Sequence, residues 1–131
     1  MLPVIVGHLP AGASVKQMVH FGQIKKSGIF RQYDYGYFEN MKKYAHIKPP
    51  QYNLTKITAP VYFYYSENDL LASVSDVDKL YLKLPNTQAK YLIPDPKFNH
   101  LDFLWATNVQ TLLYNKLISN IHKVDVSIYK N

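Results

Sequence analysis

The sequence has 131 residues, the length of one ordinary domain or of part of a larger one. Its 47% hydrophobic and 18% charged content argues against intrinsic disorder, and the lack of cysteine excludes a disulfide framework and a cysteine-based metal site. The net charge of +6 comes from 15 scattered Lys and Arg against 9 acidic residues, without a basic block or a nucleic-acid-binding motif, so it favours an anionic lipid surface at least as much as nucleic acid.

The chain begins with a short apolar stretch that is interrupted by His8 and Pro10. It has no basic leader, and no window holds the ~18 apolar residues that span a bilayer, so we expect neither a signal peptide nor a transmembrane segment in this sequence. Ser14 and Gln17 then have the spacing of a capping box, and apolar residues follow at helical intervals. We expect a helix that begins here and ends at Gly28.

Residues 29–52 contain the aromatic segment FRQYDYGYFEN and end just beyond the Pro49-Pro50 pair. Their apolar residues follow neither the helical period nor the alternation of a half-buried strand. We therefore expect irregular structure throughout this range.

The sequence after Pro60 predicts a strand and then a helix. Residues 61–65, VYFYY, form an unbroken β-prone run, which is typical of a parallel strand that is covered on both faces. Ser73 and Asp76 give the start signal of the helix, and its apolar residues continue to just before Pro85.

A second strand and a last helix complete the expected α/β unit. The strand is predicted at residues 90–93, and the helix begins at a Thr107–Gln110 capping box and runs to about Ile121. Two parallel strands do not normally make a stable sheet by themselves, so we expect this unit to be the edge of a larger structure.

Two ionisable residues follow the two predicted strands directly. Asp69 lies in the loop after the first strand, and His100 lies 31 residues later in the loop after the second. The carboxyl ends of parallel strands meet at one edge of a sheet, where active groups gather. An Asp–His pair at this edge would form a general base, because the carboxylate fixes the tautomer of the imidazole.

Other interpretations of these residues stay open at this point. An aspartate at a strand end often forms a turn, and a lone loop histidine is often solvated. Asp76, Asp78 and Asp102 are alternative acids, although Asp76 suits its helix N-terminus and Asp102 suits local bonds that hold the histidine loop. The other histidines, His8, His20, His46 and His122, share no ligand spacing, so we expect no metal or other cofactor.

Several segments together resemble the acid lipases, the gastric and lysosomal group. They are PPQYNLT, SENDLLAS, KLPN and FNHLDFLWA, preceded by LPAGASVKQMVHFGQIKKSGIFRQYDYG, which is similar to the end of that family's cap. The resemblance extends from about Leu9 to about Ile121. It implies an α/β class, namely the C-terminal part of an α/β-hydrolase fold with two parallel strands and flanking helices (53–131), preceded by the end of a mainly helical cap (1–52). It also implies that Asp69 is the triad acid and His100 the triad base.

The family's nucleophile motif is absent from this sequence. The elbow that carries the serine has the pattern G-x-S-x-G, and only Gly12-Ala13-Ser14 begins it, with Lys16 in place of the second glycine. Ser14 is better explained as a helix cap. We therefore expect a fragment that carries the acid and the base without the serine and that is inactive by itself.

Asn53-Leu54-Thr55 is an N-glycosylation sequon. Sequons also occur by chance, but the family has a similar segment and is secreted or lysosomal. The resemblance thus implies a glycoprotein modified at Asn53, in one of these two locations.

Two functions follow from these observations. The first is a lipid ester hydrolase that cleaves triacylglycerol or sterol esters at a lipid–water interface with a Ser-His-Asp triad. The alternative is a non-catalytic, basic and aromatic module that is derived from a lipase and binds a lipid surface or another protein. Nucleic-acid binding is a weaker third idea.

Overall fold

The computed structural model describes residue 7 and residues 12–128, with backbone alone for residues 124–128. His8 and Pro10 lie outside the described residues. The chain divides into two compact units, residues 1–53 and residues 54–131. None of the described helices is both long and apolar enough to cross a bilayer.

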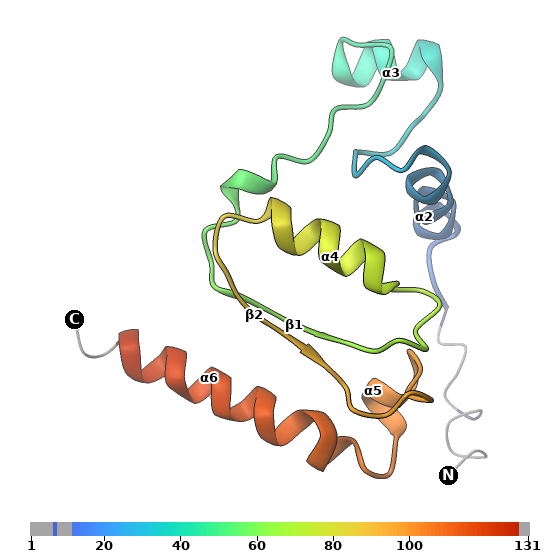
Figure 1. Ribbon diagram of the computed structural model, residues 1–131. Helices are drawn as coiled ribbons and strands as arrows, with labels where there is room; N and C mark the ends of the chain where they lie inside the picture. The colour runs from blue at the N-terminus through green and yellow to red at the C-terminus, as the bar shows by residue number, and fades with distance from the viewer. Residues whose placement is uncertain (1–6, 8–11, 129–131) are drawn as a thin grey trace. The chain divides into compact units, whose positions relative to one another are not determined.

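Among its described residues, the first unit has the helices α2 (Val15–Ser27) and α3 (Tyr37–Tyr44) (Figure 1). Helix α2 confirms the expected helix, and it ends at Gly28, whose φ of +66° lies in the left-handed region that glycine tolerates best. The expected capping box is wrong, because the side chain of Ser14 makes no capping hydrogen bond. The backbone carbonyl of Ser14 instead accepts from the amides of Gln17 and Met18.

Helix α3 corrects the expectation that residues 29–52 are wholly irregular. It begins after Gly36, whose φ is +86°, with the acidic Glu39 in its first turn and two lysines in its last turn. This order of charges complements the helix dipole, and it is the sequence signal from which the helix could have been predicted. An antiparallel bridge between Arg31 and Gln51 joins the two ends of the segment that contains the helix.

Polar contacts hold the first unit together. The amide of Asn40, which is only 1% exposed, donates to Asp34 Oδ1 and to the carbonyl of Ile47, and its oxygen accepts from the N–H of Tyr35. Helix α2 contacts the same region through its polar residues, since Gln23 exchanges two hydrogen bonds with the backbone of Asp34. Four large apolar residues of α2 are exposed, namely Val15, Met18, Val19 and Phe21, whereas Ile24 is half-buried.

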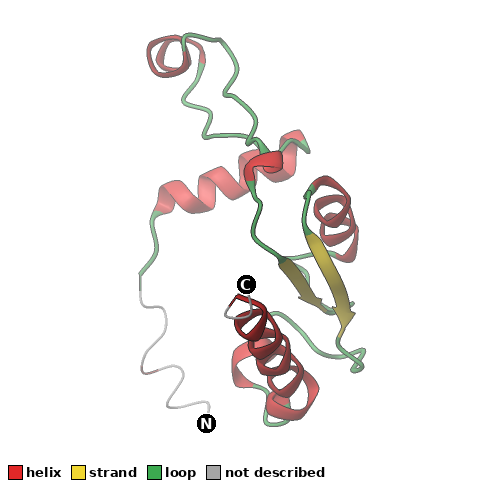
Figure 2. Cartoon of the chain, turned by 90° about the vertical axis from the view of Figure 1, so that its left-hand side faces the viewer, coloured by secondary structure: helices red, strands yellow, loops and turns green. Residues whose placement is uncertain are grey.

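The second unit is built on two parallel strands, β1 (Val61–Tyr65) and β2 (Thr87–Leu92), joined by helix α4 (Val74–Lys83). A short 3₁₀ helix, η1 (Leu54–Lys56), precedes β1. Helix α4 covers one face of the strands, and α6 (Asn115–Ile128) covers the other (Figure 1 and Figure 2). The predicted bounds of β1 are confirmed, and so is the start of α4, because Ser73 Oγ accepts from the amide of Asp76.

Several bounds differ from the prediction. Strand β2 runs from Thr87 to Leu92 rather than from Lys90 to Ile93, because pairing with β1 extends the strand through Gln88 and Ala89, which have weak β-propensity. Helix α6 continues to Ile128, beyond the expected end near Ile121. The Thr107–Gln110 capping box is also wrong. The carbonyl of Asn108 accepts the first helical hydrogen bonds, and a π-helical segment, η2 (Gln110–Tyr114), leads into α6.

The apolar core of the second unit lies between the strands and the C-terminal helices. Its buried members come from the residues that follow β2 and from the start of the last helix: Ile93, Phe98, Val109 and Leu113. Phe98 is 2% exposed and contacts Phe103 edge-to-face, with ring centroids 4.9 Å apart. The loop that carries His100 is thereby anchored in this core.

Candidate active site

The structure brings Asp69 and His100 together at the carboxyl ends of the two strands. The distance between His100 Nδ1 and Asp69 Oδ2 is 2.9 Å, although the residues are 31 positions apart in sequence. Parallel pairing produces this contact, because β1 ends at Tyr65 and its partner residue Leu92 ends β2, so both following loops leave the same edge.

The carboxylate of Asp69 is buried and fully engaged. Its side chain is 4% exposed, and Oδ1 accepts from the backbone amides of Leu71 (2.8 Å) and Ala72 (2.9 Å). Burial would by itself raise the pKa of Asp69, but the hydrogen bond from His100 and the two amide donors outweigh it, so the pKa lies below the ordinary value of 3.8. Asp69 is therefore ionised at neutral pH.

The imidazole of His100 lies between this buried carboxylate and solvent, with 51% of its side chain exposed. An ionised carboxylate can only accept a hydrogen bond, so Nδ1 carries the proton of the neutral ring. Nε2 then keeps its lone pair and can accept a proton from a group that approaches from the exposed side. Chemically, the pair is an oriented general base.

The alternative acids have other partners. The carboxylate of Asp102 accepts from the amide of Asn99 at 2.8 Å, which confirms its predicted role in holding the histidine loop. Asp76 accepts from Ser73 Oγ at the start of α4, and Asp78 pairs with Lys90.

Two polar residues of this edge were not predicted. The amide of Asn68 donates to the carbonyl of Lys97 at 2.8 Å, which links the two loops. Ser66 is completely buried at the end of β1, and its hydroxyl finds no hydrogen-bond partner among the described residues. The direct proximity of Asn68 to Asp69 was the signal that could have identified it.

The other histidines and Asn53 are the remaining residues that the sequence analysis considered. The described residues contain no group of three or more His, Cys, Asp or Glu side chains that could hold one. His20 contacts the carbonyl of Arg31, and His46 contacts the backbone of Lys48. Asn53 is exposed, at the end of the first unit.

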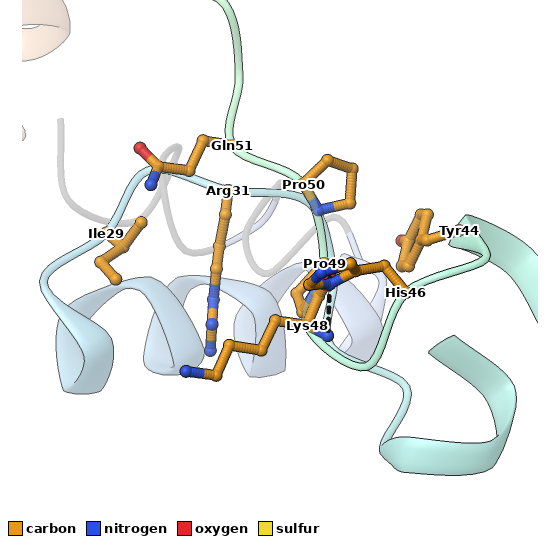
Figure 3. A pocket seen from close by; sticks show the side chains of 8 residues that line it. All are labelled: Ile29, Arg31, Tyr44, His46, Lys48, Pro49, Pro50 and Gln51. Carbon is orange, nitrogen blue, oxygen red and sulfur yellow. Dashed lines mark hydrogen bonds between the residues drawn. The ribbon is translucent and has the colours of Figure 1, made fainter. Parts of the chain in front are cut away.

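The first unit holds a cavity of about 490 Å³, lined by Ile29, Arg31, Tyr44, His46, Lys48, Pro49, Pro50 and Gln51 (Figure 3). Figure 3 shows its basic side chains Arg31, His46 and Lys48 beside Ile29 and the two prolines, with a hydrogen bond between His46 and Lys48. Arg31 already pairs with Asp34 at 3.3 Å. The cavity belongs to residues 1–53 alone, whereas Asp69 and His100 belong to the second unit.

A buried aspartate that orients a loop histidine beyond adjacent parallel strands is the acid–base half of the triad used by hydrolases of α/β fold. No protein-family model matches the chain. The chain is 48% identical over 124 residues to Lipase 1 of Drosophila melanogaster, and this match covers 95% of the chain and 28% of that protein. It is 42% identical over 116 residues to Lipase 3 of the same organism, with 88% and 29% covered.

Human gastric triacylglycerol lipase is 41% identical over 121 residues, a match that covers 92% of the chain and 30% of that lipase. The chain thus spans between a quarter and a third of the length of these relatives. Over 88–95% of its length the chain is therefore acid lipase-like.

Proposed function

We propose that this chain supplies the acid and the base of a Ser-His-Asp lipid ester hydrolase, as the C-terminal part of the catalytic core. The observation that carries the proposal is the 2.9 Å hydrogen bond between His100 Nδ1 and a buried, ionised Asp69. Residues 1–52 would form the end of the cap. The substrate would be triacylglycerol, as in the names of the gastric relatives, or a sterol ester.

In this mechanism, His100 Nε2 takes the proton of a serine hydroxyl as the serine oxygen attacks the ester carbonyl. Asp69 stabilises the imidazolium that results, and His100 then returns the proton to the leaving alcohol. The acyl-enzyme is hydrolysed by water, with His100 again acting as the base. The serine would come from outside this sequence, since no G-x-S-x-G pattern occurs in it.

A chimera tests this function. The matching segment of Drosophila Lipase 1 is replaced by this chain, and hydrolysis of a fluorogenic lipid ester is measured. We expect activity that falls about 10⁴-fold or more on His100→Ala and about 10⁴-fold on Asp69→Asn. His122→Ala, at an exposed position of α6, is the matched control and should retain activity.

Two results would contradict the proposal. Full activity of the His100→Ala chimera would remove the base from the mechanism. Ester hydrolysis by the 131-residue chain alone, with loss on His100→Ala, would show that the nucleophile lies within this sequence.

Binding to an anionic lipid surface is a second candidate function, and the exposed face of α2 favours it. Val15, Met18 and Phe21 lie exposed on a helix whose last turn carries Lys25 and Lys26. Residues 1–53 contain seven Lys and Arg against two acidic residues, a net charge of +5, whereas residues 54–131 contain eight against seven. Exposed apolar side chains beside lysines are typical of helices that lie in a lipid interface.

Vesicle partitioning separates this candidate from catalysis. We expect the chain to sediment with phosphatidylcholine–phosphatidylglycerol vesicles but not with pure phosphatidylcholine. Each lysine near the surface contributes about 1 kcal/mol, so Lys25→Gln with Lys26→Gln should weaken binding about 30-fold. The control pair Lys83→Gln with Lys123→Gln makes the same change in net charge on the second unit. An equal loss in both pairs would indicate unspecific attraction and refute the assignment to α2.

We further propose that Asn53 is glycosylated and that the protein is secreted or lysosomal. Asn53 is exposed and begins the Asn-Leu-Thr sequon. Expressed through the secretory route of a eukaryotic cell, the protein should gain mass that a peptide N-glycosidase removes. Asn53→Gln and Thr55→Ala should abolish the gain, whereas Thr55→Ser should preserve it. An unchanged gain in Asn53→Gln would contradict the site.

A further inference from the structure

Asp69 and His100 lie on two separate loops that need a connection of their own. The backbone pairing of the strands extends only as far as the bond from the Ile93 amide to the Tyr65 carbonyl, at 2.9 Å. Beyond it the chain continues as two loops, residues 66–73 and 94–101. In the part of the chain that the structure describes, two side-chain hydrogen bonds join these loops: Asn68 to Lys97, and His100 to Asp69.

We infer that Asn68 is a positioning residue that holds the histidine loop at the distance required for the Asp69–His100 bond. Asn68 directly precedes Asp69, and Lys97 lies three residues before His100. The inference rests on the proposed function, because the position of His100 matters as that of a base only there.

The Lys97 carbonyl is a firm attachment point for this bond. The amide of Lys97 donates to Asp95 Oδ1 at 2.9 Å, and the next residue, Phe98, is buried in the core. The Asn68 amide therefore binds to a fixed segment of the loop. A hydrogen bond tolerates a change of only a few tenths of an ångström in donor–acceptor distance and only a limited deviation in angle. Release of this attachment would therefore disturb the Asp69–His100 geometry before it disturbs the fold.

The opposite end of the sheet provides a matched control. The amide of Asn86 donates to the carbonyl of Thr58 at 2.8 Å and joins segments 28 residues apart, just before the two strands. The Asn68 bond has the same length and donor type and joins segments 29 residues apart, just after the strands. Asn86 is half-buried and its side-chain oxygen also accepts from Gln88, so Asn86→Ala should lower the melting temperature at least as much as Asn68→Ala.

Proton NMR of the complete chain tests the inference. The Nδ1–H of His100, bonded to a carboxylate, should give a downfield resonance, which His100→Ala identifies by its loss. We expect Asn68→Ala to broaden or abolish this resonance and Asn86→Ala to leave it unchanged. An unchanged resonance in Asn68→Ala, or an equal loss in both variants, would overturn the positioning role.

Two further measurements test the inference independently of whether Asn68→Ala folds. Should Asn68→Ala fail to fold, Asn68→Gln keeps a donor amide and should fold with a shifted resonance, whereas a resonance identical to wild type would overturn the inference. In the Lipase 1 chimera, Asn68→Ala should lower kcat about 10- to 100-fold with little change in KM. An inactive chimera would count against the proposed function but not against the NMR result, so the two failures are distinguishable.

Discussion

Substitution of Asp69 separates its structural contribution from its chemical one. In Asp69→Ala, the amides of Leu71 and Ala72 lose their acceptor. A hydrogen bond to a charged group contributes about 1.5–3 kcal/mol net, so loss of the two bonds should cost about 3–6 kcal/mol, which is a large part of the stability of a small domain. In Asp69→Asn, the side-chain oxygen can still accept from both amides, so the loss should be about 1–2 kcal/mol.

The chemical effect of Asp69→Asn should nevertheless be large. The amide nitrogen of the new side chain would face His100 Nδ1 and donate to it, so the ring proton would move to Nε2. Nε2 could then no longer accept a proton. Urea denaturation should report the two stabilities, and imidazole ¹⁵N shifts of His100 should report the tautomer. The reasoning would be refuted by equal losses of stability in both variants, or by a tautomer in Asp69→Asn that matches the wild type.

Three other outcomes follow from the same contacts. The pKa of Asp69 lies below the ordinary value of 3.8, so its contribution to stability is present above that value and is lost as the pH falls below it. In urea denaturation between about pH 5 and pH 2, the free energy of unfolding should therefore decline less steeply in Asp69→Asn than in the unsubstituted chain. Asn120 is buried and its amide donates to Tyr64 Oη at 2.7 Å, so Asn120→Ala should lower the free energy of unfolding by about 1–3 kcal/mol. In the same denaturation assay, the double substitution with Tyr64→Phe should cost less than the sum of the two single substitutions. Leu113→Ala removes a side chain that is 4% exposed and should cost about 2–5 kcal/mol, while Leu82→Ala, at an 83% exposed position of α4, should cost under about 0.5 kcal/mol; similar losses would contradict the core assigned to the second unit.

The elements that sequence predicted well are those whose signals are local. The run of residues 61–65 and the Ser73–Asp76 cap lie within the elements they specify, and the structure has β1 and α4 at these positions. The first three residues of β2, Thr87 to Ala89, have no such signal and are extended because β1 pairs with them. The π-helical start of the last helix likewise has no recognisable sequence pattern.

The first unit was harder to predict because polar contacts over long sequence distances determine it. Asn40 connects Asp34 with Ile47, and Gln23 connects α2 with Asp34. Hydrophobic periodicity does not register such contacts. Periodicity identified the apolar stripe of α2 but not its surroundings, and Val15, Met18 and Val19 of this stripe are exposed.

The two members of the Asp–His pair depend on the fold in different ways. Both amides that orient Asp69 belong to residues 71 and 72, so the acid is positioned by a four-residue turn wherever β1 ends. The side chain of the base has no such bonds from its own loop, although Asp102 holds the amide of Asn99 next to it. Its loop is anchored through Phe98, which packs against Val109 and Leu113 of the C-terminal helices, and through the bond from Asn68. Because the base depends on this distant packing and the acid does not, a substitution such as Leu113→Ala should release His100 while the amides of Leu71 and Ala72 stay protected from hydrogen exchange. Equal loss of both signals would mean that acid and base are held as one cooperative unit.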